Sequence, residues 1–325
     1  MKHPCHSWQI WLALSCLMMT GSLGYSVQAQ APVWQMGIAA GNPGLAYNSV
    51  ANVTTTDAVG NVYVAGSFAG VATFGSTTLS SFGTYDMFVA KWSPVTGNFV
   101  WAVQAGGVNG NGGTVAQAVV VSGTSVYVAG SFFGATAVFG GTTLPNTGAG
   151  YRDLFVSKLT DAGATASFVW TQHAGGTRDE EVSGLGYSEG ILYLAGSFGS
   201  PAVTIGTTTL GTASATNGFI AKLVDTGPAG VFGWAQPIGG ASVTQAAALV
   251  VNAADVYVTG SFSGTASLGT ATLTSAGGTD IFVAKLTDQG STAALKWARP
   301  LGGAANDFGA GLALQGASVY VAGTF

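Results

Sequence analysis

Cysteine is nearly missing from this chain. The 325 residues contain two, Cys5 and Cys16, and both lie close to the N-terminus. The rest of the sequence offers no thiol, which excludes a disulfide and a cysteine-ligated metal there. Its stability must therefore come from packing and hydrogen bonds.

Charge and histidine are also scarce. Lys and Arg contribute 9 residues and Asp and Glu 13, for a net charge of −4. Because binding to a phosphate backbone needs a basic patch, and the sequence has none, we expect no nucleic-acid partner. His173 is the one histidine after the first 29 residues, and no Gly-x-Ser-x-Gly motif accompanies it, so we interpret it as structural or exposed. We expect no catalytic residue in this chain.

Apolar residues and glycine are abundant instead. They make up 48% of the chain and 51 positions respectively, beside many Thr, Ser and Ala. That apolar content excludes disorder, and the many glycines indicate an all-β protein with frequent turns.

The first 29 residues have the pattern of a secretory signal peptide. Lys2 is followed by an apolar run from Trp8 to about Met19, and Val27-Gln28-Ala29 then forms a small-residue cleavage site. The run is too short to span a bilayer, so we expect no transmembrane segment after cleavage. The alternative is a lipoprotein anchor at Cys16. Either signal predicts a secreted or cell-surface protein that passes through the periplasm.

A seven-residue phrase recurs through residues 30–325. It reads VYVAGSF at 62–68 and 126–132, LYLAGSF at 192–198, VYVTGSF at 256–262 and VYVAGTF at 319–325. A fixed spacing, of about 64 residues here, indicates one supersecondary unit repeated along the chain. The sequence predicts four full repeats and part of a fifth.

Each repeat contains four β-type segments. In the second repeat they are residues 113–121, 125–132, 154–159 and 168–174, and all are rich in β-branched and aromatic residues between turn residues. Four antiparallel strands per repeat predict a β-propeller of four-stranded blades. Short phrases at 73–79, 138–144, 204–210 and 267–273 predict an extra hairpin between the second and third strands. The glycine of the seven-residue phrase, at 66, 130, 196 and 260, predicts a bulge or a close backbone approach.

These residues suggest a family. GNVYVAGSF at 60–68, DMFVAKW at 86–92, DIFVAKL at 280–286 and the Trp…Gly-Gly phrase resemble the bacterial SBBP-type β-propeller repeat of secreted Bacteroidota proteins. The resemblance covers nearly all of residues 31–325. It implies a propeller and a secreted or surface location, with no assigned activity. Such arrays commonly precede a sorting domain; none follows Phe325, so we expect the parent protein to be longer.

Two residue series recur once per repeat. We interpret Lys91, Lys158, Lys222 and Lys285 as structural residues that pair with an acid, with Asp86, Asp153 and Asp280 standing five positions earlier in three repeats. Trp101, Trp170, Trp234 and Trp297 are expected to pack between repeats, so truncation of one to Ala should cost about 3–5 kcal/mol.

The connectors between repeats are the candidate binding face, since variable loops on a regular scaffold usually carry binding. Arg178-Asp179-Glu180-Glu181 is the densest charge cluster, and counting from each Trp aligns Glu180 with Asp307, Asn111 and Thr244. Together with Asn109 and Asn306 these residues would form a ring of oxygens on one face. Such oxygens suit Ca²⁺, which is the one cofactor considered, although no compact Asp-x-Asp-x-Asp-Gly loop is present.

Two functions fit these observations. The first is a non-catalytic, monomeric binding or scaffold module that presents one loop face to a glycan, a protein or the cell surface. The alternative is an enzyme of the pyrroloquinoline-quinone dehydrogenase type, because Lys-Leu-Thr-Asp-x-Gly followed by Trp, at 158–170 and 285–297, is faintly similar to its tryptophan-docking repeat. That cofactor would need a cation, a basic residue and an acid, which the cluster at 179–181 would have to supply.

Overall fold

The computed structural model describes residues 49–108, 111–148, 150–211 and 215–325. They belong to one compact unit, Ala40–Phe325. Every helix or strand among them is a β-strand, and the named strands pair antiparallel. The predicted all-β class is confirmed. The proposed signal segment, residues 1–29, lies outside the described residues.

Four repeats each contribute four strands that pair in chain order. Repeat 1 has β1 (Ser49–Thr56), β2 (Val62–Phe68), β5 (Asp86–Ser93) and β6 (Asn98–Gly107). Repeat 2 has β7 (Gly113–Ser122), β8 (Ser125–Phe133), β11 (Asp153–Asp161) and β12 (Ala166–Ala174). Repeat 3 has β13 (Glu180–Ser188), β14 (Ile191–Phe198), β17 (Asn217–Asp225) and β18 (Gly230–Gly239). Repeat 4 has β19 (Thr244–Asn252), β20 (Asp255–Leu268), β21 (Ala271–Asp288) and β22 (Ala293–Leu301), and repeat 5 has β23 (Phe308–Gln315) and β24 (Ser318–Thr324).

The predicted hairpin is present in all four full repeats. It is formed by β3 (Val71–Phe74) with β4 (Thr77–Ser80), β9 (Thr136–Phe139) with β10 (Thr142–Pro145), β15 (Ala202–Ile205) with β16 (Thr208–Gly211), and the adjoining ends of β20 and β21. Two of these hairpins also pair with the end of the preceding repeat, since β9 pairs with β6 and β20 with β18. The hairpin therefore ties one repeat to the one before it.

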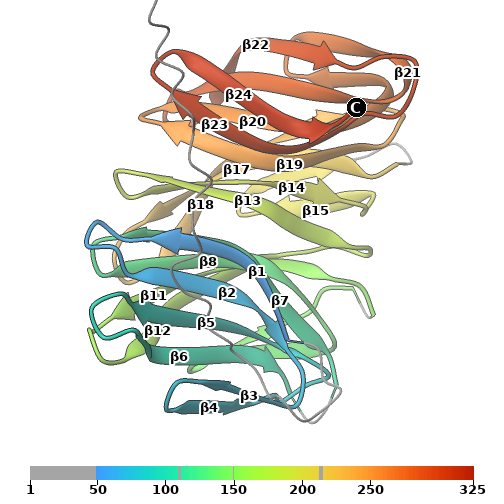
Figure 1. Ribbon diagram of the computed structural model, residues 1–325. Coiled ribbons are helices and arrows are strands. Elements are labelled where there is room, and N and C mark those ends of the chain that lie inside the picture. The colour runs from blue at the N-terminus through green and yellow to red at the C-terminus, as the bar shows by residue number, and fades with distance from the viewer. Residues whose placement is uncertain (1–48, 109–110, 149, 212–214) are drawn as a thin grey trace, which may run out of the picture. The chain divides into compact units, whose positions relative to one another are not determined.

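The first strands of successive repeats lie against one another. β1 contacts β7, β7 contacts β13, β13 contacts β19, and β19 contacts β23. Figure 1 shows β1 beside β7. The Asn52 amide donates to the Ala116 carbonyl at 2.9 Å, and the Ser183 hydroxyl donates to the Ala246 carbonyl at 2.6 Å. No sheet of the described strands closes on itself.

The glycine of the seven-residue phrase, in the second strand of each full repeat, lies opposite a bulge in the first strand. A Cβ at Gly130 would overlap the carbonyl oxygen of Val115, and the register between β7 and β8 shifts between Ala116 and Ala118. The same overlap and shift recur at Gly66, Gly196 and Gly260. The predicted close approach is confirmed, and it explains why a residue with no side chain is used there.

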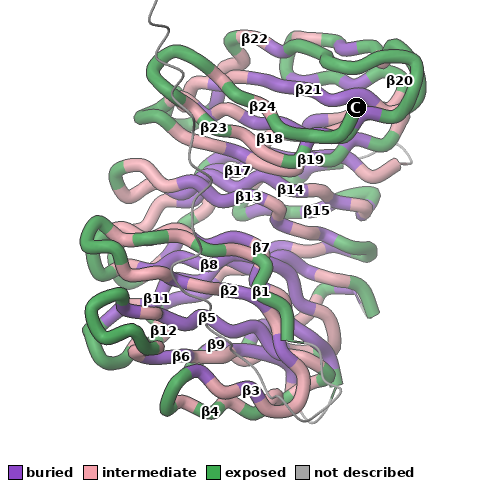
Figure 2. Tube along the Cα trace, viewed as in Figure 1, coloured by how far each residue is buried: buried purple, intermediate pink, exposed green. Residues whose placement is uncertain are grey.

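The core is a row of aromatic and aliphatic clusters along the strands. The tyrosines of the first three phrases, Tyr63, Tyr127 and Tyr193, are each 1% exposed. Figure 2 shows this burial in the middle strands, whereas β24 is largely exposed. Trp101, Trp170 and Trp234 are buried too, which agrees with the expected packing between repeats.

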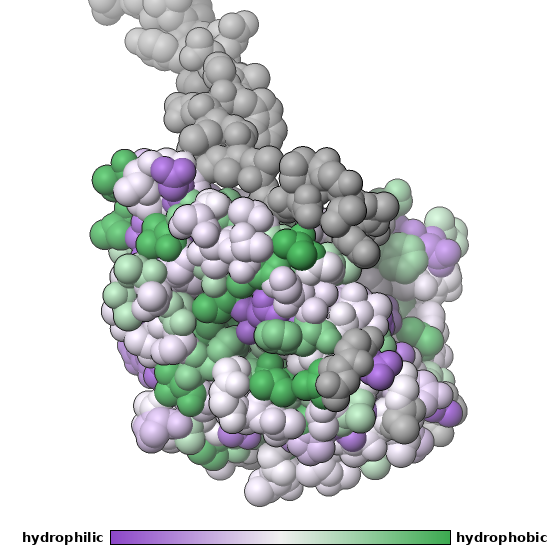
Figure 3. Space-filling view, turned by 90° about the horizontal axis from the view of Figure 1, so that it is seen from below, coloured by the Kyte–Doolittle hydropathy of each residue, from purple (hydrophilic) through white to green (hydrophobic). Residues whose placement is uncertain are grey.

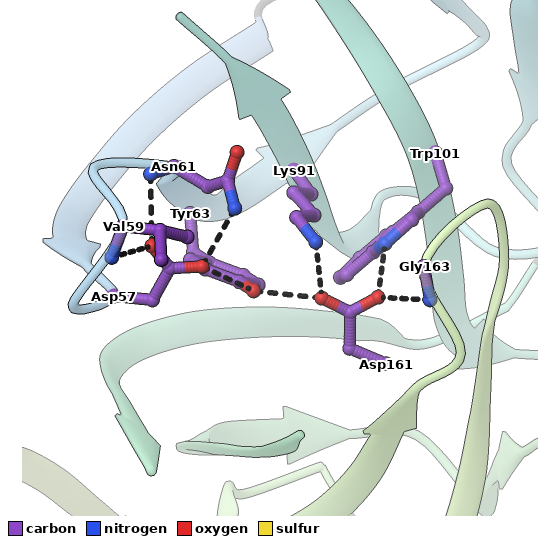
Figure 4. A network of polar contacts seen from close by, with 8 residues as sticks. All are labelled: Asp57, Val59, Asn61, Tyr63, Lys91, Trp101, Asp161 and Gly163. Atoms are coloured by element: carbon purple, nitrogen blue, oxygen red, sulfur yellow. Dashed lines mark hydrogen bonds and ion pairs between the residues drawn. The ribbon is translucent and has the colours of Figure 1, made fainter. Parts of the chain in front are cut away.

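One buried carboxylate joins each of the first three repeats to the next, a contact that we call the carboxylate clasp. Asp161 of repeat 2 accepts hydrogen bonds from Tyr63 Oη at 2.7 Å, Lys91 Nζ at 2.6 Å and Trp101 Nε1 at 3.0 Å, all from repeat 1 (Figure 4). The backbone N–H of Gly163 donates to the same carboxylate at 2.9 Å. We call the Tyr, Lys and Trp of one repeat its donor triad.

The clasp recurs twice more. The donor triad Tyr127, Lys158 and Trp170 meets Asp225, and the donor triad Tyr193, Lys222 and Trp234 meets Asp288. Burial disfavours the charged carboxylate, but the hydrogen bonds from lysine, tyrosine, glycine and tryptophan outweigh it and lower the pKa of all three acids.

The expectation that each lysine pairs with an acid is confirmed, but the acid is not the one five positions earlier. In repeats 1 to 3 it stands in the Asp-x-Gly turn of the following repeat. Asp86 and Asp153 instead accept backbone N–H groups of the preceding loop, from Phe82 and Thr147.

Candidate functional site

A pocket of about 330 Å³ opens among the connectors of repeats 1 to 3. Its lining comes from the residue before β5, the end of β8, the loop before β11 and the connector before β13. The lining residues are Tyr85, Phe133, Gly150, Tyr151, Arg152 and Asp179. The lining is not repeated in sequence, since the positions of Phe133, Tyr151 and Asp179 hold Gly199, Ala215 and Val243 one repeat later.

Three of the lining residues are aromatic. Tyr85 and Phe133 pack with ring centroids 5.6 Å apart and planes at 54°. A Cβ at Gly113 would lie about 2.5 Å from the Tyr85 ring and 2.6 Å from the Phe133 ring, so this glycine lets the two rings meet. Tyr151 is 45% exposed and presents its ring to solvent. The pocket thus offers both a fixed and an accessible aromatic surface.

The lining also includes the polar side chains of Arg152 and Asp179. The Arg152 backbone N–H donates to Asp179 Oδ1 at 2.9 Å, which fixes that carboxylate at the pocket edge. The Arg152 guanidinium donates to Glu181 Oε1 at 2.9 Å, and both side chains remain more than a third exposed. Such an exposed ion pair is worth about 0–1 kcal/mol, so a ligand can exchange it for its own hydrogen bonds at little cost.

The four residues of the predicted charge cluster have different surroundings. Asp179 lines the pocket and Glu181 borders it through Arg152, whereas Arg178 is exposed and donates its backbone N–H to Ser200 Oγ. Glu180 is fully buried and accepts the Ser200 backbone N–H at 3.2 Å. The structure therefore brings two of the four to the pocket.

Burial makes Glu180 unusual. Its pKa is raised to about 7, mainly by desolvation and also by the nearby Asp153 carboxylate, against the hydrogen bonds that it accepts. Desolvation raises the pKa of Asp153 as well. Within the described residues, Glu180 Oε2 and Asp153 Oδ1 have no hydrogen-bond partner. This pair is a structural feature beneath the connector rather than part of its surface.

Counting from each Trp aligns the connector positions correctly in three repeats and wrongly in one, while the ring of oxygens itself stays a prediction. The backbone N–H groups of four connector residues make equivalent bonds to the carbonyl of the residue before the Asp or Asn that stands five positions ahead of each repeated Lys. The four donors are Thr114, Glu180, Thr244 and Asp307. Thr114, not Asn111, is thus the counterpart in repeat 2. Thr114 lies 13 positions after Trp101, whereas Glu180 lies 10 after Trp170, so counting from Trp fails across this longer connector.

The remaining ring residues serve the backbone or lie elsewhere. Asn306 accepts the Thr279 backbone N–H at 2.9 Å, the bond that Asp179 makes with Arg152. Asn109 lies outside the described residues. The described part of the chain contains no group of three or more His, Cys, Asp or Glu side chains placed to hold a metal. Ca²⁺ binding stays a prediction without a defined site.

A second pocket, of about 260 Å³, lies along the first strands of repeats 2 to 5. Small and polar residues dominate its lining, among them Gln117, Ser183, Ser197 and Gln245, with Glu181 at one edge. His173 lies apart from both pockets, its ring 6.2 Å from that of Phe132, and burial lowers its pKa against the pull of Asp153.

Surface hydropathy is mixed. On the face in Figure 3, hydrophobic residues gather near the centre around a few hydrophilic ones, and residues of intermediate hydropathy occupy much of the remainder. Of the described residues, none forms a helix of the length and apolarity that crossing a membrane requires.

Comparison with models of known protein families gave no match, and comparison with curated proteins gave none either.

Sequence reasoning missed Tyr85, Phe133, Tyr151 and Arg152. Tyr85 and Tyr151-Arg152 immediately precede the third strands, outside the recurring phrases, so the repeat pattern did not single them out. An aromatic residue beside an arginine, at the point where a variable loop rejoins the scaffold, was the available signal.

Proposed function

We propose that this protein is an exported, non-catalytic binding module built as a β-propeller of four-stranded blades, and that the pocket around Tyr151 and Arg152 binds a glycan. The observation that carries the proposal is the pairing of aromatic rings with exposed polar side chains in one connector pocket. Sugar rings have apolar faces that stack on aromatic side chains and hydroxyl groups that bond to Arg and Asp.

The arrangement of the strands supports the propeller. Each repeat is a four-stranded antiparallel meander, and the first strands contact one another from repeat to repeat. Blades around an axis pack their innermost strands in this way. The pocket along the first strands of repeats 2 to 5 lies where such an axis would pass. Secretion rests on the signal-like segment at residues 1–29, and mass spectrometry of the exported protein should find Gln30 as its first residue.

The composition of the pocket favours a glycan over an apolar small molecule. Tyr151 is accessible, and Arg152, Asp179 and Glu181 offer donors and acceptors that are already oriented by backbone and side-chain bonds. A preformed site with few, fixed polar groups is the usual design of a small-ligand pocket. A single subsite of this size fits one or two sugar rings.

A glycan array with the purified protein, followed by calorimetry on the hits, tests the proposal. We expect Tyr151→Ala and Arg152→Met each to weaken binding at least about tenfold, a loss of about 1.4 kcal/mol. Tyr320→Ala removes a tyrosine of similar exposure on β24 and serves as the matched control, which should bind as the unchanged protein does.

Three results would overturn the proposal. The first is no binding to any glycan, and the second is glycan binding that Tyr151→Ala and Arg152→Met leave intact. The third is dye-linked oxidation of alcohols or sugars after addition of pyrroloquinoline quinone and Ca²⁺, which would indicate the quinoprotein alternative.

A further inference from the structure

Two carboxyl groups are buried next in sequence to residues that line the pocket around Tyr151. Asp153 follows Arg152 at the start of β11, and Glu180 follows Asp179 at the start of β13. Both acids are 0% exposed, and we call them the buried acid pair. Because one peptide bond joins each acid to a lining residue, a movement of the acids must also move the pocket walls.

Backbone contacts hold the two segments together at this point. The Glu180 N–H donates to the Arg152 carbonyl at 2.8 Å, and the Arg152 N–H donates to Asp179 Oδ1 at 2.9 Å. A Cβ at Gly148 would lie 2.5 Å from the Gly176 carbonyl oxygen, so the segments pack there without side chains between them. A force that separates the buried acid pair therefore also pulls on the bonds between these segments.

Each acid has one bonded oxygen and one without a partner. Asp153 Oδ2 accepts the Thr147 N–H at 2.7 Å, and Glu180 Oε1 accepts the Ser200 N–H at 3.2 Å. In the part of the chain that the structure describes, Asp153 Oδ1 and Glu180 Oε2 have no hydrogen-bond partner. Two buried carboxylates would repel each other and leave both of these oxygens unsatisfied. A single proton removes one of the two charges and gives the pair a donor.

The surrounding titratable groups do not neutralise the pair. Burial lowers the pKa of His173 against the pull of Asp153, so the His173 ring is uncharged above about pH 6.5. Among the described residues, no lysine, arginine or histidine forms an ion pair with either acid. A proton is thus the remaining way to reduce the charge. The surrounding groups are His173 on β12 and Arg152, Arg178, Asp179 and Glu181 on the two segments.

Two acids meet at the equivalent place at only one other junction between the described repeats. The position of Glu180 holds threonine at two junctions and Asp307 at the last. Asp307 lies near Asp280, since a Cβ at Gly302 would be 2.6 Å from an oxygen of each. Neither acid of this second pair lines the pocket, so it is a matched control for the buried acid pair.

We propose that Asp153 and Glu180 are positioning residues of the glycan pocket, which hold one proton between them and keep Arg152 and Asp179 in place only while that proton is bound. This role rests on the proposed glycan binding. Loss of the proton puts two negative charges into a buried site, and the two segments then move apart to admit water. Because the two acids are coupled, the proton belongs to the pair rather than to one residue.

Glycan binding at two pH values tests this role. Burial raises the pKa of Glu180 to about 7, so roughly one molecule in ten keeps the proton at pH 8. Serial dilutions of N-terminally labelled protein on the glycan array give an apparent Kd for each bound glycan at pH 6 and at pH 8. If only the protonated pair supports the pocket, the apparent Kd should rise about tenfold between these two pH values.

Two variants separate the buried acid pair from the rest of the protein. Glu180→Gln stays uncharged, so its apparent Kd should change less than about twofold between pH 6 and pH 8. Asp307→Asn alters the equivalent pair away from the pocket, so it should keep the rise of about tenfold. Neither side chain lines the pocket, so both variants should bind at pH 6 as the unchanged protein does.

An NMR titration without glycan follows the proton itself. The backbone N–H signals of Arg152 and Glu180 report the two bonds that join the segments. In nitrogen-15 spectra over a pH series, we expect both signals of the unchanged protein to shift with a common midpoint near pH 7. Asp307→Asn should keep that shift, whereas the Arg152 signal of Glu180→Gln should stay constant.

The proposal is overturned if the unchanged protein binds equally at pH 6 and pH 8, if Glu180→Gln keeps the loss at pH 8, or if Asp307→Asn abolishes it. Recovery of binding at pH 8 on addition of Ca²⁺ would assign a cation to the pair and would overturn it as well. If no glycan binds at pH 6, the proposed function fails, and a midpoint near pH 7 in the NMR titration would still support the shared proton. A titration without such a midpoint overturns the shared proton even where glycan binding is found.

Discussion

Removal of the Asp225 charge is the sharpest test of the clasp. Asp225 accepts hydrogen bonds from Tyr127 Oη and Lys158 Nζ, both at 2.6 Å, from Trp170 Nε1 at 3.1 Å and from the Gly227 N–H at 2.9 Å. Asp225→Asn keeps the shape of the side chain but removes its charge and one acceptor. The ammonium of Lys158, whose side chain is 11% exposed, would then lose its counterion in a buried site.

The expected cost follows from burial. Breaking a buried ion pair by removing one partner costs about 3–5 kcal/mol, because the remaining charge is desolvated without compensation. The Lys285–Asp255 pair in repeat 4 is a matched control, since its side chains are 23% and 31% exposed. Asp255→Asn should therefore cost only about 0–1 kcal/mol. The two substitutions are chemically identical, and the difference is expected from the deeper burial of the Lys158–Asp225 pair and from the Tyr127 and Trp170 donors that Asp225 also satisfies.

Urea unfolding followed by tryptophan fluorescence measures both costs. Because stability in a repeat protein is a sum over neighbouring interfaces, Asp225→Asn should act on a transition that involves repeats 2 and 3. Adding Lys158→Met to Asp225→Asn removes the stranded charge and should recover at least half of the loss. If Asp225→Asn costs no more than Asp255→Asn, the argument from burial is refuted.

Three further predictions concern single groups. Gly130→Ala should cost about 1–3 kcal/mol or more in urea unfolding because the new Cβ would overlap the Val115 carbonyl, while Gly141→Ala, which meets nothing within 4 Å, should be nearly neutral. Burial raises the pKa of Glu180 to about 7, so the folded state binds the Glu180 proton more tightly than the unfolded state does. The free energy of unfolding therefore falls as the pH rises from about 4 to 7. Glu180→Gln should remove that fall and stabilise the protein by about 3 kcal/mol at pH 8, but not at pH 4. The clasp acids Asp161, Asp225 and Asp288 have lowered pKa values in the folded state. Their contribution to the free energy of unfolding is therefore complete above about pH 4 and is lost as the pH falls through their folded-state pKa values. Urea midpoints measured over an acid pH series would follow this loss.

Local patterns in the sequence predicted the features that depend on local physics. Alternating β-branched and aromatic runs between turn residues gave the strands of repeat 2 within two residues at each end, and the short Thr-Gly phrases gave the inserted hairpins. The glycine of the seven-residue phrase was singled out because it recurs at the same position in every repeat, which predicted that the backbone there has no room for a side chain. The overlap of a Gly130 Cβ with Val115 confirms that prediction.

The features that sequence reasoning missed depend on contacts between repeats. The acid that pairs with Lys91 is Asp161, 70 positions later in the sequence. Asp161 belongs to an Asp-x-Gly turn, and an Asp in such a turn is already explained by the turn itself. Acids on the same strand were nearer in sequence, but a strand places residues five positions apart on opposite faces. The pocket was missed in a different way: the charged connector at Asp179 was recognised, but its aromatic partners Tyr85 and Tyr151 come from loops outside the recurring phrases.

The clasp explains how nearly identical repeats keep a single alignment. The buried faces of the repeats are made of similar Val, Ala and Phe residues, so apolar packing alone is similar in several registers between neighbouring repeats. A carboxylate that needs three donors at once is satisfied in one register only, and a shifted register would strand both Lys158 and Asp225 away from water. Because a buried ion pair adds little net stability over apolar packing, we infer that the clasp serves alignment. It is also directional, with donors in one repeat and the acid in the next.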